Sequence, residues 1–222
     1  MPKIQSKEYQ KCLPDYFLTF GEYWNDKNNS SSTPIAIGNP KINSSNVKRA
    51  KPQDKQERKT ITFISDYLII DYFTDLITRL IKELKLSDKY EIRIRPHPND
   101  FNIMEKYRTL SDQTGIKVIY NETIQKTLEN TDIIVSEGST VIFEALCYNV
   151  KIFIRNTQSA HFTFPDTTGY WFNDADDFLD QLESIDWNRQ KEIEIDYYFN
   201  KNWEENYKAF INKFIKDDKV HE

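Results

Sequence analysis

A chain of 222 residues with a formal net charge of -5 has room for one sizeable α/β core and an appendage, but not for two full domains. Charged residues make up 29% and hydrophobic residues 38%, as in ordinary soluble globular proteins. The acidic balance offers no basic face for nucleic acid, and the apolar runs are too short for a membrane span or a signal peptide. We therefore expect a cytoplasmic protein with no nucleic-acid partner and at most peripheral membrane association.

The first part of the chain differs from the rest. DYFLTFGEYW, which starts at Asp15, and PIAIGNP, which starts at Pro34, have the β-branched and aromatic content of short strands. Gly38 and Pro40 predict a tight turn after the second of them. Residues 46–58 are polar, charged and contain proline, which predicts a linker.

Strand patterns alternate with helical patterns over residues 59–185. The β-branched stretches that predict strands are 59–65, 90–96, 116–120, 132–136 and 150–155. The helical periods lie at 67–86, 102–115, 123–131, 139–149 and 174–185. This alternation predicts an α/β, Rossmann-like parallel sheet with helices on both faces.

The remaining features favour packing over chemistry. Residues 186–222 carry aromatic side chains close to a helical stripe, which predicts a C-terminal aromatic helical segment. Cys147 lies in an apolar stretch and is expected to be a small core residue, and it has no paired spacing with Cys12 that would make a zinc site. The acidic pair Asp176 and Asp177 lies at a helix start, so no metal site and no cofactor are expected.

Two motifs follow predicted strands at the same edge of the sheet. Arg95-Pro96-His97-Pro98 ends the strand at 90–96, and Glu137-Gly138-Ser139-Thr140 follows the strand at 132–136. In an open parallel sheet, ligands bind beyond the carboxyl ends of the strands, where the following helices begin. The sequence therefore predicts that both motifs contribute to one ligand site.

The motif around Gly138 suits a phosphate. Gly138 lets the backbone approach a ligand closely, and Ser139 and Thr140 offer hydroxyls beside unpaired helix amides. Glu144 shares the helical face of Thr140 and can reach a ribose hydroxyl. The alternative is that Ser139 only caps the helix and Glu144 only favours its dipole.

The prolines on both sides of His97 restrict its backbone and give the imidazole a defined direction. A histidine held in this way can donate to a phosphate oxygen or act as an acid. The alternative is a turn histidine that bonds to the backbone. Arg95 can neutralise phosphate charge, or it can be solvated or ion-paired.

Together, RPHP after one strand and DIIVSEGSTVIFEAL followed by VKIFI resemble the C-terminal, donor-binding half of GT-B glycosyltransferases. The likeness is to the group with a His-Pro motif, which includes capsule polysaccharide enzymes, bacterial sialyl- and polysialyltransferases and glycerophosphotransferases of teichoic acid synthesis. UDP-N-acetylglucosamine 2-epimerases share the architecture, but the glycine pair of their motif is absent at Gly138-Ser139. Residues 1–45 are similar to the end of the N-terminal domain and the crossover of these transferases.

The resemblance implies a role for each matching position. His97 would contact the nucleotide phosphate of a CMP-, CDP- or UDP-linked donor as the catalytic residue, and Glu144 would bind the ribose. The donor site would comprise Arg95, His97, Pro98, Glu137, Gly138, Ser139, Thr140 and Glu144. Because these enzymes work between two domains, the chain would need a complementary N-terminal half or transferase subunit to reach a glycan acceptor.

Two other functions remain open at this point. One is a noncatalytic nucleotide- or partner-binding module that keeps the same fold. The other is epimerase-like chemistry on a UDP-sugar, which requires further acid and base residues. The stretch 156–173, which contains His161, is expected to be a loop over the donor or a simple surface segment.

Overall fold

The computed structural model describes residues 11–28, 30–42, 58–187 and 194–217. It divides into two compact units, Lys48–Lys191, here called the sheet unit, and Met1–Val47 with Glu192–Glu222, here called the terminal unit. The predicted linker at 46–58 lies outside the described residues except for Arg58.

The sheet unit contains one sheet of six parallel strands in the order β5-β4-β3-β6-β7-β8. The strands are β3 (Lys59–Ile64), β4 (Tyr90–Arg95), β5 (Lys117–Val118), β6 (Ile133–Ser136), β7 (Lys151–Arg155) and β8 (Tyr170–Phe172). All four residues of β6 and five of the six in β3 are buried, as in a parallel sheet covered on both faces. The predicted α/β, Rossmann-like parallel sheet is confirmed.

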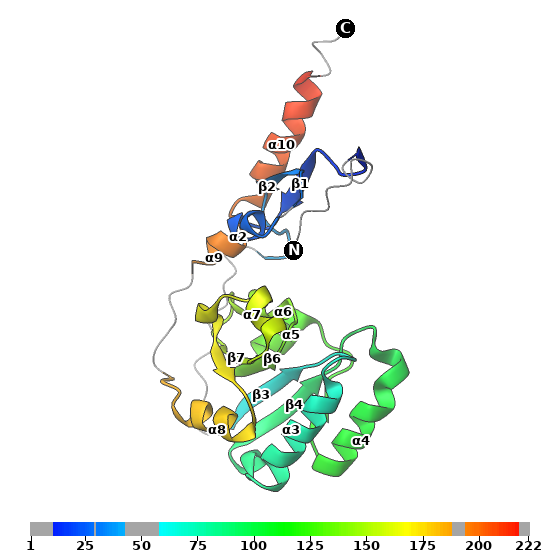
Figure 1. Cartoon of the computed structure of the whole chain (residues 1–222), viewed down its shortest axis with the longest axis vertical. Coiled ribbons are helices and arrows are strands. Elements are labelled where there is room, and N and C mark those ends of the chain that lie inside the picture. Colours follow the sequence, from blue (N-terminus) through cyan, green and yellow to red (C-terminus); the bar gives the residue numbers. More distant parts are fainter. Residues whose placement is uncertain (1–10, 29, 43–57, 188–193, 218–222) are drawn as a thin grey trace. The chain divides into compact units, whose positions relative to one another are not determined.

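Helices cover both faces of this sheet. They are α3 (Ile70–Lys82), α4 (Met104–Thr114), α5 (Ile124–Glu129), α6 (Val141–Ala145), α7 (Gln158–Thr163) and α8 (Ala175–Glu183), with the single 3-10 turns η2 (Leu86–Asp88), η3 (Asp100–Ile103) and η4 (Asp166–Thr168). Ile133 and Val135 pack into the core cluster with α3, α4 and α8, whereas Ile134 between them is buried outside that cluster. Figure 1 shows α3 and α4 side by side over β3 and β4.

Local sequence signals begin and end several helices as expected. Gly115 follows α4 with φ of 75°, the left-handed conformation that glycine adopts without strain. Thr123 caps α5, since its side chain accepts a hydrogen bond from the Lys126 N–H. Asp174 accepts from the N–H groups of Asp176 and Asp177 at the start of α8.

The stretch 156–173 is not a simple loop. It contains α7, η4 and β8, and β8 pairs with β7 from Phe153 to Arg155. Three residues, Tyr-Trp-Phe, are too few to show strand alternation in the sequence.

The helix predicted at 139–149 is shorter in the structure. The N–H groups of Leu146, Cys147 and Tyr148 donate to carbonyls three residues earlier, as in a 3-10 turn.

The terminal unit joins the two ends of the chain. Its elements are β1 (Tyr16–Thr19), α2 (Glu22–Asp26), β2 (Thr33–Ala36), α9 (Ile195–Tyr198) and α10 (Trp203–Asp217), and β1 pairs with β2 in parallel. Trp24 Nε1 donates to the Tyr198 carbonyl at 2.9 Å, and the rings of Tyr16 and Phe210 pack edge to face. Phe210 and the backbone of Tyr198 in the C-terminal segment therefore contact the N-terminal segment.

Gly169 tests the pairing of β7 with β8. A Cβ at this position would clash with the Ile152 carbonyl oxygen, so we expect Gly169→Ala to destabilise the fold by about 3 kcal/mol. Gly138→Ala is the matched control, because a Cβ there meets no atom within 4 Å. Urea unfolding of both variants checks this, and an equal loss in both would contradict it.

Candidate functional site

Both predicted motifs leave the sheet at the same edge, on either side of β3. Arg95 of β4 is level with Ile64, and Val135 of β6 is level with Phe63, so the three strands end at similar heights. With β3 between them, β4 and β6 are about 10 Å apart, twice the usual strand spacing. Strands β4 and β5 follow β3 on one side of the sheet, and β6, β7 and β8 follow on its other side, so the strand order reverses between β3 and β6. Open α/β sheets bind ligands at such a reversal.

His97 lies in the loop after β4 with one ring nitrogen engaged. Its Nδ1 accepts a hydrogen bond from the Asn99 N–H at 3.2 Å. A nitrogen that accepts carries no proton, so the proton of the neutral imidazole is on Nε2. Pro96 is buried and His97 and Pro98 are exposed, and the ring thus presents an N–H donor at the surface.

A buried network holds this loop in place. Asp100 is 3% exposed, and its Oδ2 accepts from the Tyr107 hydroxyl at 2.7 Å and from the His97 N–H at 3.2 Å. The Tyr107 hydroxyl also lies 3.2 Å from Ser65 Oγ at the end of β3. Burial, together with the neighbouring Asp100 carboxylate, raises the pKa of Tyr107 well above its usual value.

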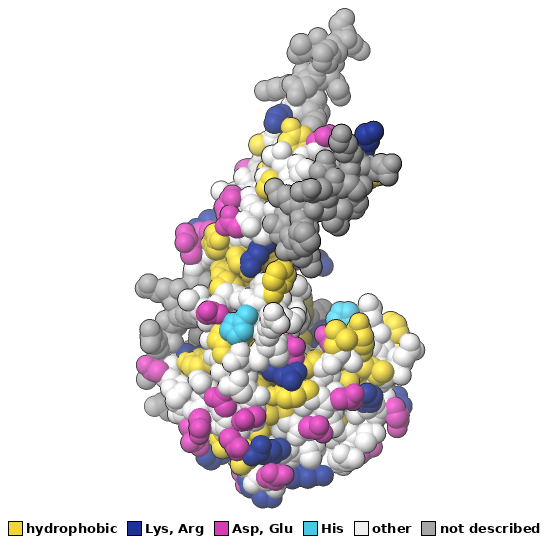
Figure 2. All heavy atoms as spheres, viewed as in Figure 1, with side chains coloured by type: hydrophobic (Ala, Val, Ile, Leu, Met, Phe, Trp, Pro, Cys, Tyr) yellow, Lys and Arg dark blue, Asp and Glu magenta, His cyan; other side chains and the backbone are white. Residues whose placement is uncertain are grey.

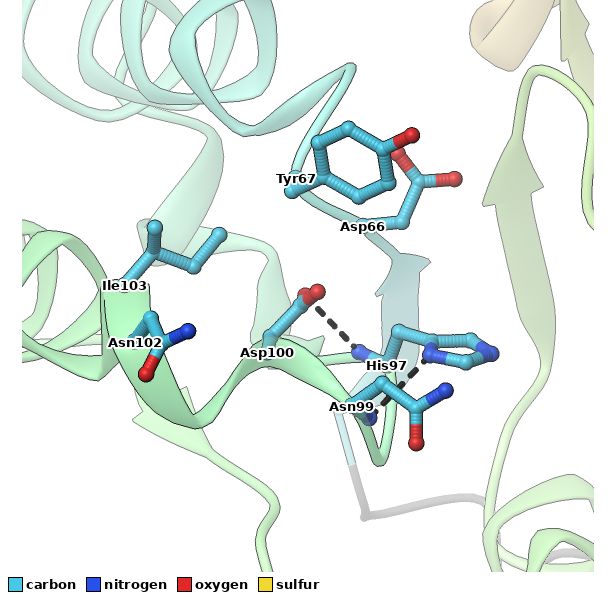
Figure 3. Close-up of a pocket in the computed structure, with 7 residues that line it drawn as sticks. All are labelled: Asp66, Tyr67, His97, Asn99, Asp100, Asn102 and Ile103. Carbon is cyan, nitrogen blue, oxygen red and sulfur yellow. Dashed lines mark hydrogen bonds between the residues drawn. The ribbon is translucent and has the colours of Figure 1, made fainter.

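A cavity of about 500 Å³ opens between the loops after β3 and β4. It is lined by Asp66, Tyr67, His97, Asn99, Asp100, Asn102 and Ile103 (Figure 3). Tyr67, Leu68 and Phe101 are exposed large apolar side chains on these loops. Figure 2 shows hydrophobic side chains gathered beside a histidine in the region of α3 and α4.

The loop after β6 has an open backbone. Gly138 is exposed, its φ is outside the left-handed region, and an added Cβ would meet no atom within 4 Å. Ser139 Oγ accepts from the Val141 N–H at 3.3 Å, whereas the N-cap position of α6 is Thr140, whose side chain makes no capping hydrogen bond. Thr140 is exposed and Glu144 is half-buried, one turn further along the same helix.

Arg95 points to the neighbouring β5–α5 connection. Its guanidinium donates to Thr127 Oγ1 at 2.8 Å and to the Glu122 carbonyl at 2.7 Å. Burial lowers the pKa of Arg95 from its usual value. These contacts give Arg95 a structural role at the edge of the sheet.

Glu137 belongs to a second charged cluster at this edge. It forms an ion pair with Arg155 at 2.8 Å and accepts from Thr157 Oγ1 at 3.2 Å. The Arg155 guanidinium lies 3.5 Å from the centre of the Tyr72 ring, in a cation–π contact. The cation at the end of β7 is therefore paired with the residue that precedes Gly138.

His161 is engaged on both ring nitrogens. Nδ1 lies 2.8 Å from Asp166 Oδ1 and Nε2 lies 2.7 Å from Asn156 Oδ1, and the ring stacks on Trp171 at 4.1 Å. These contacts fix the direction of its ring between α7, η4 and β8. Cys147 is buried as expected, and burial raises the pKa of its thiol to about 12.

No protein-family model matches the chain, and no curated protein matches it in sequence. Solved structures do match. The structure of the GtfA/B complex aligns with a TM-score of 0.54 at 10% identity, covering 94% of this chain and 47% of that one. The structure of TarM aligns with a TM-score of 0.50 at 15% identity, covering 90% of this chain and 42% of that one.

Both are GT-B glycosyltransferases. The chain has the GT-B fold. Its six-stranded sheet corresponds to the C-terminal domain of GT-B glycosyltransferases. The chain spans less than half the length of either matched structure.

The sequence did not reveal several groups at this edge of the sheet. Asp66, Tyr67, Asp100 and Arg155 reach it only through the fold, and their residue types alone carry no signal for it. The Asn99-Asp100 pair directly after Pro98 was the one available hint, because such residues favour turns. Within the described ranges, no group of His, Cys, Asp and Glu could hold a metal ion, and no helix is long and apolar enough to cross a membrane.

Tyr107→Phe tests the buried network. Loss of the hydroxyl leaves the Asp100 carboxylate with one donor fewer, so we expect a loss of about 1–2 kcal/mol at neutral pH. Because the pKa of Tyr107 is raised by folding, it contributes stability that is lost as the pH rises above about 10, the unfolded value. Urea unfolding at pH 7 and at alkaline pH should therefore show a flatter alkaline decline in the variant; an equally steep decline would contradict this.

Proposed function

We propose that this chain is the donor-binding part of a glycosyltransferase of the His-Pro motif type. It would bind a CMP-, CDP- or UDP-linked sugar or glycerol donor for bacterial capsule or surface polysaccharide synthesis in the cytoplasm. The observation that carries the proposal is that the His97 loop and the Gly138-Ser139-Thr140 loop leave the sheet at one edge, from strands about 10 Å apart on either side of β3. A nucleotide diphosphate spans such a distance.

Hydrogen-bond donors at this edge suit the phosphates. Nε2–H of His97 is free to donate, because Asn99 already occupies Nδ1. Exposed Gly138 and Thr140 offer backbone and hydroxyl groups without any side chain in the way. The reaction would be displacement at the anomeric carbon, or at phosphorus for CDP-glycerol, with the leaving phosphate stabilised by these donors.

Gly138 adds a separate argument. Gly21, Gly38 and Gly169 meet the chain's own atoms too closely for a side chain, and Gly115 has a left-handed backbone. Gly138 is the one of the five glycines that neither reason explains. Close approach of a phosphate to its backbone supplies a reason.

The rest of the enzyme would come from elsewhere. Residues 1–45 would be the end of an N-terminal domain and its crossover, and the glycan acceptor would bind a complementary half or a transferase subunit. The chain covers less than half the length of each matched structure, which supports a separate acceptor-binding part. Ser139 and Thr140 would hold the phosphates, Glu144 the ribose, and Arg95, Pro98 and Glu137 would support the donor site.

Nucleotide titration tests the proposal. We expect CMP-, CDP- or UDP-linked ligands to raise the melting temperature of the chain, since a ligand that binds only the folded state stabilises it. Gly138→Ala should keep the wild-type stability but bind the same ligand at least about tenfold more weakly, ~1.4 kcal/mol. If no nucleotide stabilises the wild-type chain, the proposal is wrong.

Arg155 supplies a second, electrostatic test. Its guanidinium is paired with Glu137, the residue before Gly138, and it would share its charge with the donor phosphates. We expect Arg155→Gln to weaken a nucleoside diphosphate about tenfold while leaving the uncharged nucleoside unaffected. Calorimetric titration of both ligands measures this, and an equal effect on the two would show that Arg155 acts only through the fold.

The noncatalytic module remains the second candidate. It shares the fold and the nucleotide site, and it predicts that His97→Ala leaves the biological role intact. Loss of polysaccharide in cells that carry His97→Ala would favour the transferase.

A further inference from the structure

The cavity between the loops after β3 and β4 contains an unsatisfied acceptor. Asp100 is buried, and both of its side-chain hydrogen bonds are made by Oδ2. Its Oδ1 makes no hydrogen bond with any residue in the described part of the chain. Protein atoms do not fully enclose this oxygen. Figure 3 shows this carboxylate directed into the space among the lining residues. An acceptor that is open toward a cavity can accept a hydrogen bond from a ligand in place of water.

The other lining groups define what kind of ligand fits. Asn99 and Asn102 provide amide donors and acceptors, and His97 can donate through Nε2. Tyr67 and Ile103 add an aromatic ring and an apolar side chain, which can pack against C–H groups. Hydroxyl groups both donate and accept, so this mixture suits a sugar or a polyol, and about 500 Å³ is a usual size for a ligand pocket.

The two carboxylates of the lining make a ligand carboxylate unfavourable beside them. Asp66 and Asp100 are both carboxylates, and the seven lining residues include no lysine or arginine. Lys106 on α4 is engaged by Asp71 at 2.6 Å and 2.8 Å, so that pair is neutral. A ligand carboxylate in this cavity would face two negative charges with no cation to offset them.

We propose that this cavity binds the transferred group of the donor and selects an uncharged, hydroxyl-bearing one, a neutral sugar or glycerol, over an acidic sugar. One ligand hydroxyl donates to Asp100 Oδ1, and the Tyr67 ring covers a C–H face. The assignment to the transferred group rests on the function proposed above. It narrows that function, because the His-Pro group includes transferases of both acidic and neutral groups.

The test uses free ligands, so that it does not depend on the identity of the nucleotide. The ¹⁵N-labelled chain is titrated with glucose, N-acetylglucosamine and glycerol, and in parallel with glucuronate and N-acetylneuraminate. At least one neutral ligand should shift the amide signals of Tyr67 and of residues 99–103. The acidic sugars should bind there at least about tenfold more weakly. Equal binding of glucose and glucuronate, or no shift of these amides by any neutral ligand, would overturn the proposal.

Asp66→Asn is the matched variant. Asp66 Oδ1 accepts from the N–H groups of Leu68 and Ile69 before α3, and an asparagine oxygen accepts in the same way. Loss of the charge should reduce the discrimination between glucose and glucuronate at least about threefold. Asp100→Asn is the second variant and should act in the same direction. Unchanged discrimination in the folded variants would overturn the proposal.

The same samples are then titrated with CDP and UDP. Nucleotide binding without any shift from the neutral ligands overturns only the sugar cavity. Binding of a neutral sugar without nucleotide binding overturns only the proposed function and leaves the selectivity of the cavity standing.

Discussion

The hydrogen bond from the Tyr107 hydroxyl to the buried Asp100 carboxylate determines the shape of the site. The same Oδ2 atom accepts from the His97 N–H, so the carboxylate fixes the turn that begins at His97. This turn lets the Asn99 N–H donate to Nδ1 of the His97 ring, which leaves Nε2 as the outward donor. Since Tyr107 is fully buried against the sheet, a side chain on α4 sets the direction of an imidazole on a loop.

The fold could be predicted because its signals are local. The β-branched runs, the glycine after α4 at Gly115 and the threonine at Thr123 each act within a few residues, and the structure agrees with all of them. Strand β8 was not predicted, because its three aromatic residues show no alternation of apolar and polar side chains. Its place is decided by pairing with β7 and by Phe172 entering the core.

The site could be predicted only in part, for the same reason. The two motifs are visible in the sequence, and parallel strands require their loops to leave at one edge. Their partners are not visible, because Ser65 lies 42 residues from Tyr107, and Arg155 lies 18 residues from Glu137. Contacts over such separations follow from strand order. The sequence also left open whether Ser139 caps the helix; in the structure the N-cap of α6 is Thr140, and Ser139 Oγ accepts from the Val141 N–H.

The terminal unit is built from residues at opposite ends of the chain. Trp24 donates to Tyr198, 174 positions later, and Asn206 donates to the carbonyl of Ile37. During synthesis the sheet unit, Lys48–Lys191, leaves the ribosome complete, whereas the first strands must wait for the last helix. Until α9 and α10 are synthesised, β1 and β2 lack the aromatic cover that these helices provide. A chain truncated after α8 would therefore keep the sheet and expose the N-terminal segment to chaperones and proteases.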